Sequence, residues 1–348
     1  MTLFNRQYGA RSTAGALLLL LPAIAACGQN SPKEDKTMHE SRATVSAEDT
    51  VDALNGVFGK HAKTRGSHAK GFCIKGEFTP AESEFTDIPL FGNGVIPITG
   101  RFSLGGGNPK ASDKSRGVRG VALRFNLPSG DVHDLVMISA PIFFASTPEQ
   151  FVEFLKVRTA DPTTGEKNPA KIAEFNEANP NVMPHLNYVS QTAPSASYAS
   201  SPYFSTHAFL FGAEDSDRQA ARWVFKPSGG FVGLTAAEED NFPDDFLEAE
   251  LNKRLAKGPA EWDAFLQKAQ NGDDVTDPSA EWASGDDNFV KVGQLKISQT
   301  IESGSNEDCT GQIFDPNNLT ADIEATDDPI LKIRRPAYAV SFGRRVAD

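Results

Sequence analysis

The feature that most constrains the fold is a pair of extended apolar segments joined by turn residues. In residues 121–127 the large apolar side chains stand at the odd positions, and Pro128-Ser129-Gly130 follows them. A second extended segment covers residues 132–138. Successive side chains of a strand point to opposite faces, so alternation indicates a strand with one buried face. The two segments therefore predict two strands connected by a turn.

Similar segments recur along the chain, with helical segments between them. Further strands are expected within 72–145 and at 207–211, 221–226, 230–234 and 289–301, and the region 160–202 is polar and rich in proline. Helices are expected to begin at Ser46 and at Thr147, which are good N-caps, and a third helix covers 246–257. Many short strands suggest a closed barrel. The fold class is therefore α+β, an antiparallel β-barrel core with surrounding helices.

The first residues have the composition of a secretion signal. Arg6 and Arg11 precede an apolar stretch at 14–26, which is too short for a confident membrane span. The stretch ends in Ile24-Ala25-Ala26-Cys27, which resembles the lipid-attachment box of bacterial lipoproteins. A plain signal peptide followed by an incidental cysteine is the alternative.

These features predict three parts of the chain. Residues 1–26 form a signal peptide, residues 27–45 a lipidated Cys27 with a polar, flexible tether, and residues 46–348 one folded domain. Such a protein is held at the membrane only by its acyl chains. Gly28 rather than Asp follows the cysteine, which by resemblance favours anchoring to the outer membrane, on the periplasmic side.

Charge and cysteine content narrow the function classes further. The net charge is −12 over 348 residues, and such an acidic balance argues against a nucleic-acid partner. Besides Cys27 the chain holds only Cys73 and Cys309. In an oxidising compartment these two could form a disulfide. Two separate buried thiols agree equally well with the sequence.

Two short polar motifs stand at opposite ends of the expected domain. One is Arg65-Gly66-Ser67-His68-Ala69-Lys70-Gly71, and the other is Arg334-Arg335-Pro336-Ala337-Tyr338, with Arg345 beyond it. An imidazole both accepts and donates protons near neutral pH. A phenolate can ligate ferric iron, and an arginine one helical turn away would stabilise its charge. Alone, the first motif is more simply a structural histidine and the second an amphipathic helix.

The order of four segments along the chain favours a shared site over a structural histidine and an unrelated amphipathic helix. The segments are 68–78, 101–103 with 119–125, 134–151, and 314–338, and in this order they resemble the haem catalases, in particular the small catalase-related peroxidases. The resemblance implies a haem b (iron) protein with a catalase-like β-barrel. It also implies that the haem pocket lies between the barrel and a C-terminal helix.

The resemblance assigns a role to each matching residue. His68 is the catalytic acid–base, with Ser103 holding its ring, and Tyr338 is the iron ligand, supported by Arg334. The remaining cofactor-binding residues are three propionate-binding arginines and two phenylalanines against the macrocycle: Arg65, Arg101, Arg345, Phe143 and Phe151. His207 is expected to be structural support. The cysteines and histidines show no zinc spacing.

One position departs from the family. Catalases place two asparagines between the Asp-Leu-Val strand and the Pro-x-Phe-Phe segment, and here these positions are Ile138 and Ser139. Isoleucine cannot donate a hydrogen bond to peroxide. The two-electron oxidation of a second peroxide should therefore suffer most, which predicts weak or no catalase activity.

The expected function is a haem peroxidase that reduces organic hydroperoxides and hydrogen peroxide with a small-molecule reductant. The chain stops three residues after Arg345, so the resemblance to small family members implies an open route to the iron and a monomer or homodimer. The alternative from another class is a non-catalytic lipoprotein of the same fold that binds haem or an apolar ligand. A hydroperoxide-rearranging haem enzyme is a second enzymatic alternative.

Overall fold

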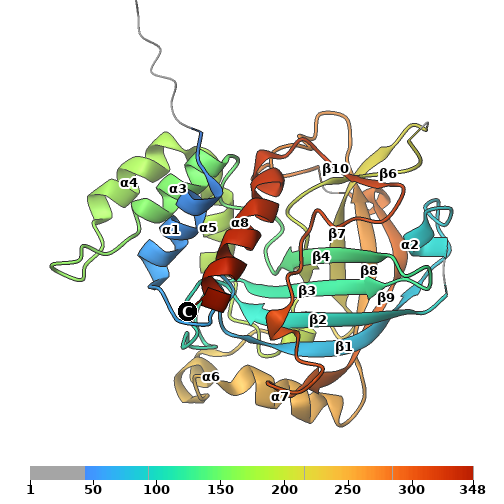
Figure 1. The fold of residues 1–348 in the computed structure, drawn as a ribbon, viewed down its shortest axis with the longest axis horizontal. Coiled ribbons are helices and arrows are strands. Elements are labelled where there is room, and N and C mark those ends of the chain that lie inside the picture. The colour runs from blue at the N-terminus through green and yellow to red at the C-terminus, as the bar shows by residue number, and fades with distance from the viewer. Residues whose placement is uncertain (1–43, 93, 215, 284, 348) are drawn as a thin grey trace, which may run out of the picture. The chain divides into compact units, whose positions relative to one another are not determined.

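The computed structural model describes residues 44–92, 94–214, 216–283 and 285–347, and its centre is an antiparallel β-barrel (Figure 1). Eight strands close into a ring in the order β7-β5-β4-β3-β2-β1-β9-β8, because β7 pairs with both β5 and β8. These strands are β1 (Gly71–Pro80), β2 (Ile96–Leu104), β3 (Arg119–Asn126), β4 (Val132–Ile138), β5 (Tyr203–Phe204), β7 (Gln219–Pro227), β8 (Ala260–Lys268) and β9 (Phe289–Ile301). The short strands β6 (Phe209–Phe211) and β10 (Ile323–Ala325) extend the sheet beyond β7. The expected α+β class with a barrel core is confirmed.

Large aromatic side chains fill the interior of the barrel. Phe102, Phe125, Trp223 and Trp262 are completely buried there. Each stands on a strand whose neighbouring positions face the other way, as the period of a strand requires. Burial of this aromatic surface stabilises the barrel.

The outer faces of β1 to β4 carry the positions that matter for function. The strand register aligns one row across the sheet as Gly71, Ser103, Gly120 and Ile138. The next row is Cys73, Arg101, Ala122 and Val136. Residues that are far apart in the sequence thus become neighbours on one face of the barrel.

Helices surround the barrel (Figure 1). The helices are α1 (Ala47–Phe58), α2 (Pro89–Gly92), α3 (Pro148–Lys156), α4 (Pro169–Ala178), α5 (Met183–Gln191), α6 (Ala236–Asn241), α7 (Phe246–Leu255) and α8 (Pro329–Ala347). Three of them, α1, α3 and α8, lie over this outer face of the barrel. Ser46 caps α1 in a capping box with Asp49, and Thr147 caps α3, as the sequence predicts. The C-terminal helix α8 contacts α1 and α3, so these three helices stand together beside the barrel.

The structure differs from the sequence analysis at one expected strand and adds elements in two segments for which none was predicted. Residues 230–234 form no strand but one isolated bridge, Ser195 to Gly233, because Gly230 takes a left-handed φ of 74°. Strand β8 was not predicted, although Trp262, Ala264 and Leu266 alternate within it. The proline-rich region contains α4 and α5, because its prolines stand in first helical turns, where no amide hydrogen is needed.

Two further expectations concern membranes. The predicted signal peptide, Cys27 and nearly all of the tether lie outside the described residues. Within the described part, no helix combines the length and the apolar character that a bilayer crossing requires.

Candidate functional site

A cavity of about 570 Å³ lies between the outer face of the barrel and the helices α1, α3 and α8. Strands β2, β3 and β4 contribute one wall, and α8 contributes residues from Ile330 to Arg345. Both end motifs meet here, because His68 and Tyr338 line the same cavity. Its size is in the range of small-molecule and cofactor sites.

The charged side chains that line the described cavity are all positive. Five arginines line it, Arg65, Arg101, Arg116, Arg334 and Arg345, and no aspartate, glutamate or lysine of the described chain does. This is unusual in a protein with a net charge of −12. The rest of the lining is mainly apolar. The cavity is therefore suited to a large apolar ligand that carries negative charges at one end.

Arg65, Arg101 and Arg345 lie close enough to affect one another electrostatically, and together they are called the cationic end of the cavity. The Arg65 Nη2 group donates to the carbonyl oxygens of Cys309, Thr310 and Gln312 at 3.4, 3.3 and 2.8 Å. Burial, together with the neighbouring charges of Arg101 and Arg345, lowers the pKa of Arg65 to about 9.

The guanidinium of Arg345 bears directly on whether haem fits. Its Nη1 and Nη2 atoms are buried and have no hydrogen-bond partner within the described residues. Buried donors are nearly always satisfied, so an anionic group is expected at this position. The haem propionates are carboxylates, which match guanidinium in charge and geometry. The cationic end thus fits the group that the sequence analysis implies.

Arg101 makes contacts that the sequence analysis did not foresee. Its Nη1 and Nη2 groups donate to the carbonyl oxygens of His68 and Ala69 at 2.7 and 2.9 Å. A Cβ atom on Gly71 would lie 2.9 Å from the Arg101 Cζ atom and 2.1 Å from the Phe102 carbonyl oxygen. Glycine at this position therefore allows the guanidinium to lie over the backbone of β1. Arg101 holds the His68 segment as well as lining the cavity.

The histidine itself occupies a constrained position. His68 has a φ of 52°, a left-handed conformation that is uncommon outside glycine. Its Nδ1 atom lies 2.9 Å from the Ser103 hydroxyl oxygen. A Cβ atom on Gly120 would lie 2.6 Å from the same Nδ1 atom, so only glycine leaves room for the ring against β3.

The electrostatic surroundings keep His68 neutral. Burial, followed by the charges of Arg101, Arg334 and Arg65, lowers the pKa of His68 to about 4. A neutral imidazole is a proton acceptor at physiological pH. Because Nδ1 interacts with Ser103, Nε2 is the nitrogen left for a ligand in the cavity.

Tyr338 stands on α8, one helical turn after Arg334. The Arg334 Nε and Nη2 groups donate to the Tyr338 phenolic oxygen at 3.0 and 2.5 Å. A guanidinium in this position stabilises a phenolate, the form that ligates iron. The structure therefore places the two residues in the relation that the sequence predicts for an iron ligand and its supporting cation.

Close to this pair, His207 and Asp328 form a buried hydrogen bond. The Nδ1 atom of His207 lies 2.6 Å from Asp328 Oδ2, and both side chains are almost fully buried. The other carboxylate oxygen of Asp328 accepts from the backbone amides of Ile330 and Leu331 at the start of α8. The sequence analysis gave His207 a structural role but missed this use of Asp328. An aspartate just before a helix was the available signal.

Phe143 and Phe151 line the apolar part of the cavity. Their ring centroids are 6.1 Å apart and their planes differ by 9°, so the rings are stacked. Such flat aromatic walls suit a planar macrocycle.

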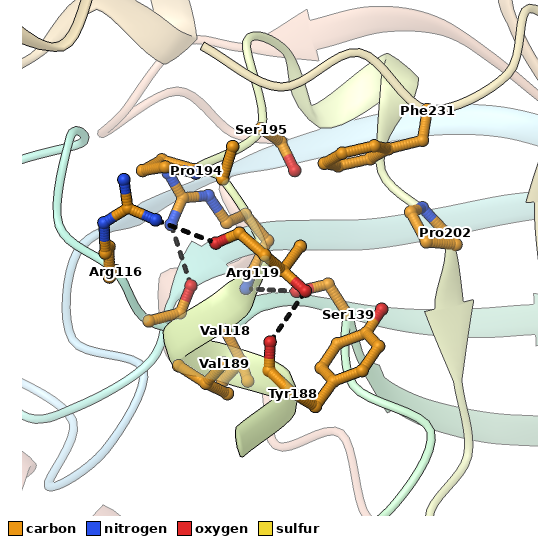
Figure 2. A pocket seen from close by; sticks show the side chains of 13 residues that line it. Arg116, Val118, Arg119, Ser139, Tyr188, Val189, Pro194, Ser195, Pro202 and Phe231 are labelled. Carbon is orange, nitrogen blue, oxygen red and sulfur yellow. Dashed lines mark hydrogen bonds between the residues drawn. The ribbon is translucent and has the colours of Figure 1, made fainter. Parts of the chain in front are cut away.

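The two positions that hold asparagine in catalases face different pockets. Ile138 lines the large cavity next to Gly120, with which it pairs across the sheet. Ser139 lines a separate pocket of about 20 Å³ (Figure 2). There its hydroxyl oxygen accepts from the backbone amide of Arg119 at 2.9 Å. Neither residue therefore offers a hydrogen-bond donor to the large cavity at this point.

Comparison with known proteins agrees with this geometry. The family model described as catalase matches residues 28–347. A protein named catalase-related peroxidase from Synechococcus elongatus is 35% identical over 303 residues, which cover 86% of this chain and 89% of the relative. One of the same name from Mycolicibacterium paratuberculosis is 33% identical over 305 residues, which cover 86% and 95%.

Solved structures show the same fold. Catalase A from Saccharomyces cerevisiae superposes with a TM-score of 0.73 at 22% sequence identity. The match covers 82% of this chain and 62% of that catalase, so the chain spans less than two thirds of the larger protein.

Proposed function

The chain belongs to the catalase family, and on this premise we propose that it is a haem-dependent peroxidase. It would reduce organic hydroperoxides and hydrogen peroxide at the expense of a small-molecule reductant. One observation carries the proposal: His68 and the Arg334–Tyr338 pair line a single apolar cavity, and among the described residues its charged lining consists of arginines alone.

Different residues would bind different parts of the cofactor. Tyr338 would ligate the iron of haem b, and Arg334 would stabilise the phenolate. Arg65, Arg345 and, to a lesser degree, Arg101 would bind the propionates, while Phe143 and Phe151 contact the macrocycle. Bound haem would supply an iron that exchanges electrons with both a peroxide and a reductant.

His68 would move the proton of the substrate. A hydroperoxide must lose a proton from one oxygen and gain one on the other before the O–O bond breaks into water or an alcohol. The neutral imidazole accepts the first proton at Nε2 and returns it to the leaving oxygen. Ser103 and Arg101 hold the ring and its backbone, which preserves this geometry between the two steps.

The apolar character of the substrate side favours organic hydroperoxides and disfavours catalase turnover. At Ile138 a second peroxide finds no donor to orient it while it is oxidised. Replacing Ile138 by asparagine is expected to raise the ratio of oxygen release to peroxidase rate about 10-fold, which is part of what one preorganised donor contributes. The two rates are measured with an oxygen electrode and by dye oxidation.

The matched control for this change is Ile138→Val, which keeps the side chain apolar and should leave the ratio unchanged. An unchanged ratio in the asparagine variant would show that Ile138 does not limit catalase turnover.

The same residue favours the second candidate, a haem- or apolar-ligand-binding lipoprotein without catalysis, because it removes part of the reactive side. The two candidates differ in turnover. A purified protein that contains haem but oxidises no dye with either cumene hydroperoxide or hydrogen peroxide would leave only the binding function.

We also propose that the protein is a periplasmic lipoprotein, anchored through Cys27 to the outer membrane, and a monomer or homodimer. The lipid-attachment box carries this proposal, and a disulfide elsewhere in the chain supports an oxidising compartment. The variant Cys27→Ser should move from the membrane fraction to a soluble fraction. A wild-type protein that is extracted without detergent would contradict the anchor, and light scattering gives the oligomeric state.

A further inference from the structure

We infer that the disulfide between Cys73 and Cys309 positions Arg65 for binding the propionate carboxylates of haem. The inference rests on the proposed function, because it concerns the affinity for that cofactor. It assigns a role to a covalent bond whose two cysteines take no part in the chemistry.

The disulfide lies directly behind the cationic end of the cavity. It joins residues 236 positions apart and settles the alternative that the sequence left open. Cys73 stands on β1, paired across the sheet with Arg101, and Cys309 begins a short 3₁₀ turn, Cys309–Gly311. Both cysteines are buried with Ile301 and Phe314.

The segment fixed by Cys309 contacts Arg65 through its backbone. The carbonyl oxygens of Cys309, Thr310 and Gln312, here called the carbonyl cradle, all accept from Arg65 Nη2. Within the described residues, the hydrogen bonds of Arg65 use only this nitrogen. Its Nε and Nη1 groups are thus left to donate to a carboxylate in the cavity that it lines.

Arg65 needs this support because two of its neighbours are cations. Arg101 and Arg345 both act against its positive charge, whereas Asp308 and Tyr338 favour it. In the low dielectric of a buried site, like charges drive side chains apart unless other groups hold them. Three carbonyl dipoles directed at one guanidinium add to the compensation.

Packing alone gives the carbonyl cradle little support. The residues at 302–307 before it are exposed, as are Thr310 and Gly311 within it. Asp308 accepts from the Thr310 amide at 2.9 Å, and the Ile313 carbonyl oxygen accepts from Arg124 at 3.0 Å. A disulfide at Cys309 therefore anchors a segment that otherwise depends on a few hydrogen bonds.

A double-mutant cycle tests the inference. The variants are Cys73→Ala with Cys309→Ala, Arg65→Ala, and all three changes together, and the measurement is titration of the apoproteins with haem, followed by visible absorbance. Loss of the disulfide should weaken haem binding about 10-fold, as supporting contacts of bound groups typically do. In the Arg65→Ala background, loss of the disulfide should weaken haem binding by less than about 2-fold more. Arg65→Ala has then already removed the interaction that the disulfide supports.

Two outcomes would overturn the inference. Equal weakening in both backgrounds would mean that the disulfide stabilises the fold in general, and no weakening at all would mean that the carbonyl cradle holds without it. If the double alanine variant does not fold, the same cycle is run with Asp308→Ala, which loosens the Thr310 amide and leaves the disulfide intact, and with Asp308→Asn, which removes the charge that favours Arg65 but keeps an acceptor for that amide. An unmodified protein that binds no haem would overturn the proposed function instead.

A measurement on the apoprotein distinguishes failure of this inference from failure of the proposed function. Trypsin cleaves after an arginine only when its side chain is free to leave its partners. In the apoprotein, cleavage after Arg65 relative to cleavage after Lys167, an exposed residue of the segment before α4 that serves as internal reference, should rise at least about 3-fold without the disulfide, because a local opening of the Arg65 segment becomes more frequent. An unchanged ratio would show that the disulfide does not hold Arg65.

Discussion

Replacing His68 by alanine is expected to lower kcat/KM for peroxide reduction by about 10³-fold, in the range of general acid–base catalysis, while haem is retained. The imidazole lines the cavity, and Ser103 fixes its orientation through Nδ1. The variant therefore lacks the proton acceptor that we propose for the peroxide. Stopped-flow absorbance with hydrogen peroxide and with cumene hydroperoxide measures the effect.

The matched control is His61→Ala, seven positions away in the same loop. His61 contacts the Phe58 carbonyl oxygen and does not line the cavity, so its loss should leave the rate unchanged. A His68→Ala variant that keeps the wild-type rate would remove this residue from the mechanism.

The pH dependence of the wild-type protein gives a second test of the same assignment. Histidine acts as a base only when it is neutral, and it gains its proton as the pH falls through its pKa. Because that pKa is lowered to about 4, the rate constant should stay level from neutral pH down to about pH 5 and decline below it. A decline centred near the ordinary value of about 6.5 would show a solvent-exposed imidazole.

Replacing Tyr338 by phenylalanine is expected to weaken haem binding by at least about 100-fold, since it removes the proposed iron ligand itself rather than a supporting group. It also removes the acceptor of the Arg334 guanidinium, which would then face an apolar ring. The haem absorption band of the purified variant should be nearly lost, and the remaining protein should be folded by circular dichroism.

Tyr188→Phe is the control for this change. Tyr188 lines the small pocket of Figure 2 and not the large cavity, so the variant should keep its haem. A Tyr338→Phe variant with an unchanged spectrum would show that another residue ligates the iron.

Local sequence patterns predicted the fold where each segment carried its own signal. The alternation in β3 and the run that forms β4 mark strands, and the capping residues Ser46 and Thr147 mark the starts of α1 and α3. The patterns failed where tertiary contacts decide. Residues 230–234 contain extended apolar positions but find only one bridging partner. Strand β8, in contrast, carries an alternation of its own at Trp262, Ala264 and Leu266, which the prediction did not use.

By itself, the sequence determined which chemical groups are present and to which family their order belongs. His68, Tyr338 and the arginines could be named because short motifs keep their spacing along the chain. Only the tertiary structure decided that Arg101 supports the His68 backbone, that Gly120 leaves room for its ring, and that Cys73 reaches Cys309. Each of these contacts depends on strand register or helix packing, which bring distant residues together and leave no periodic trace in the sequence between them.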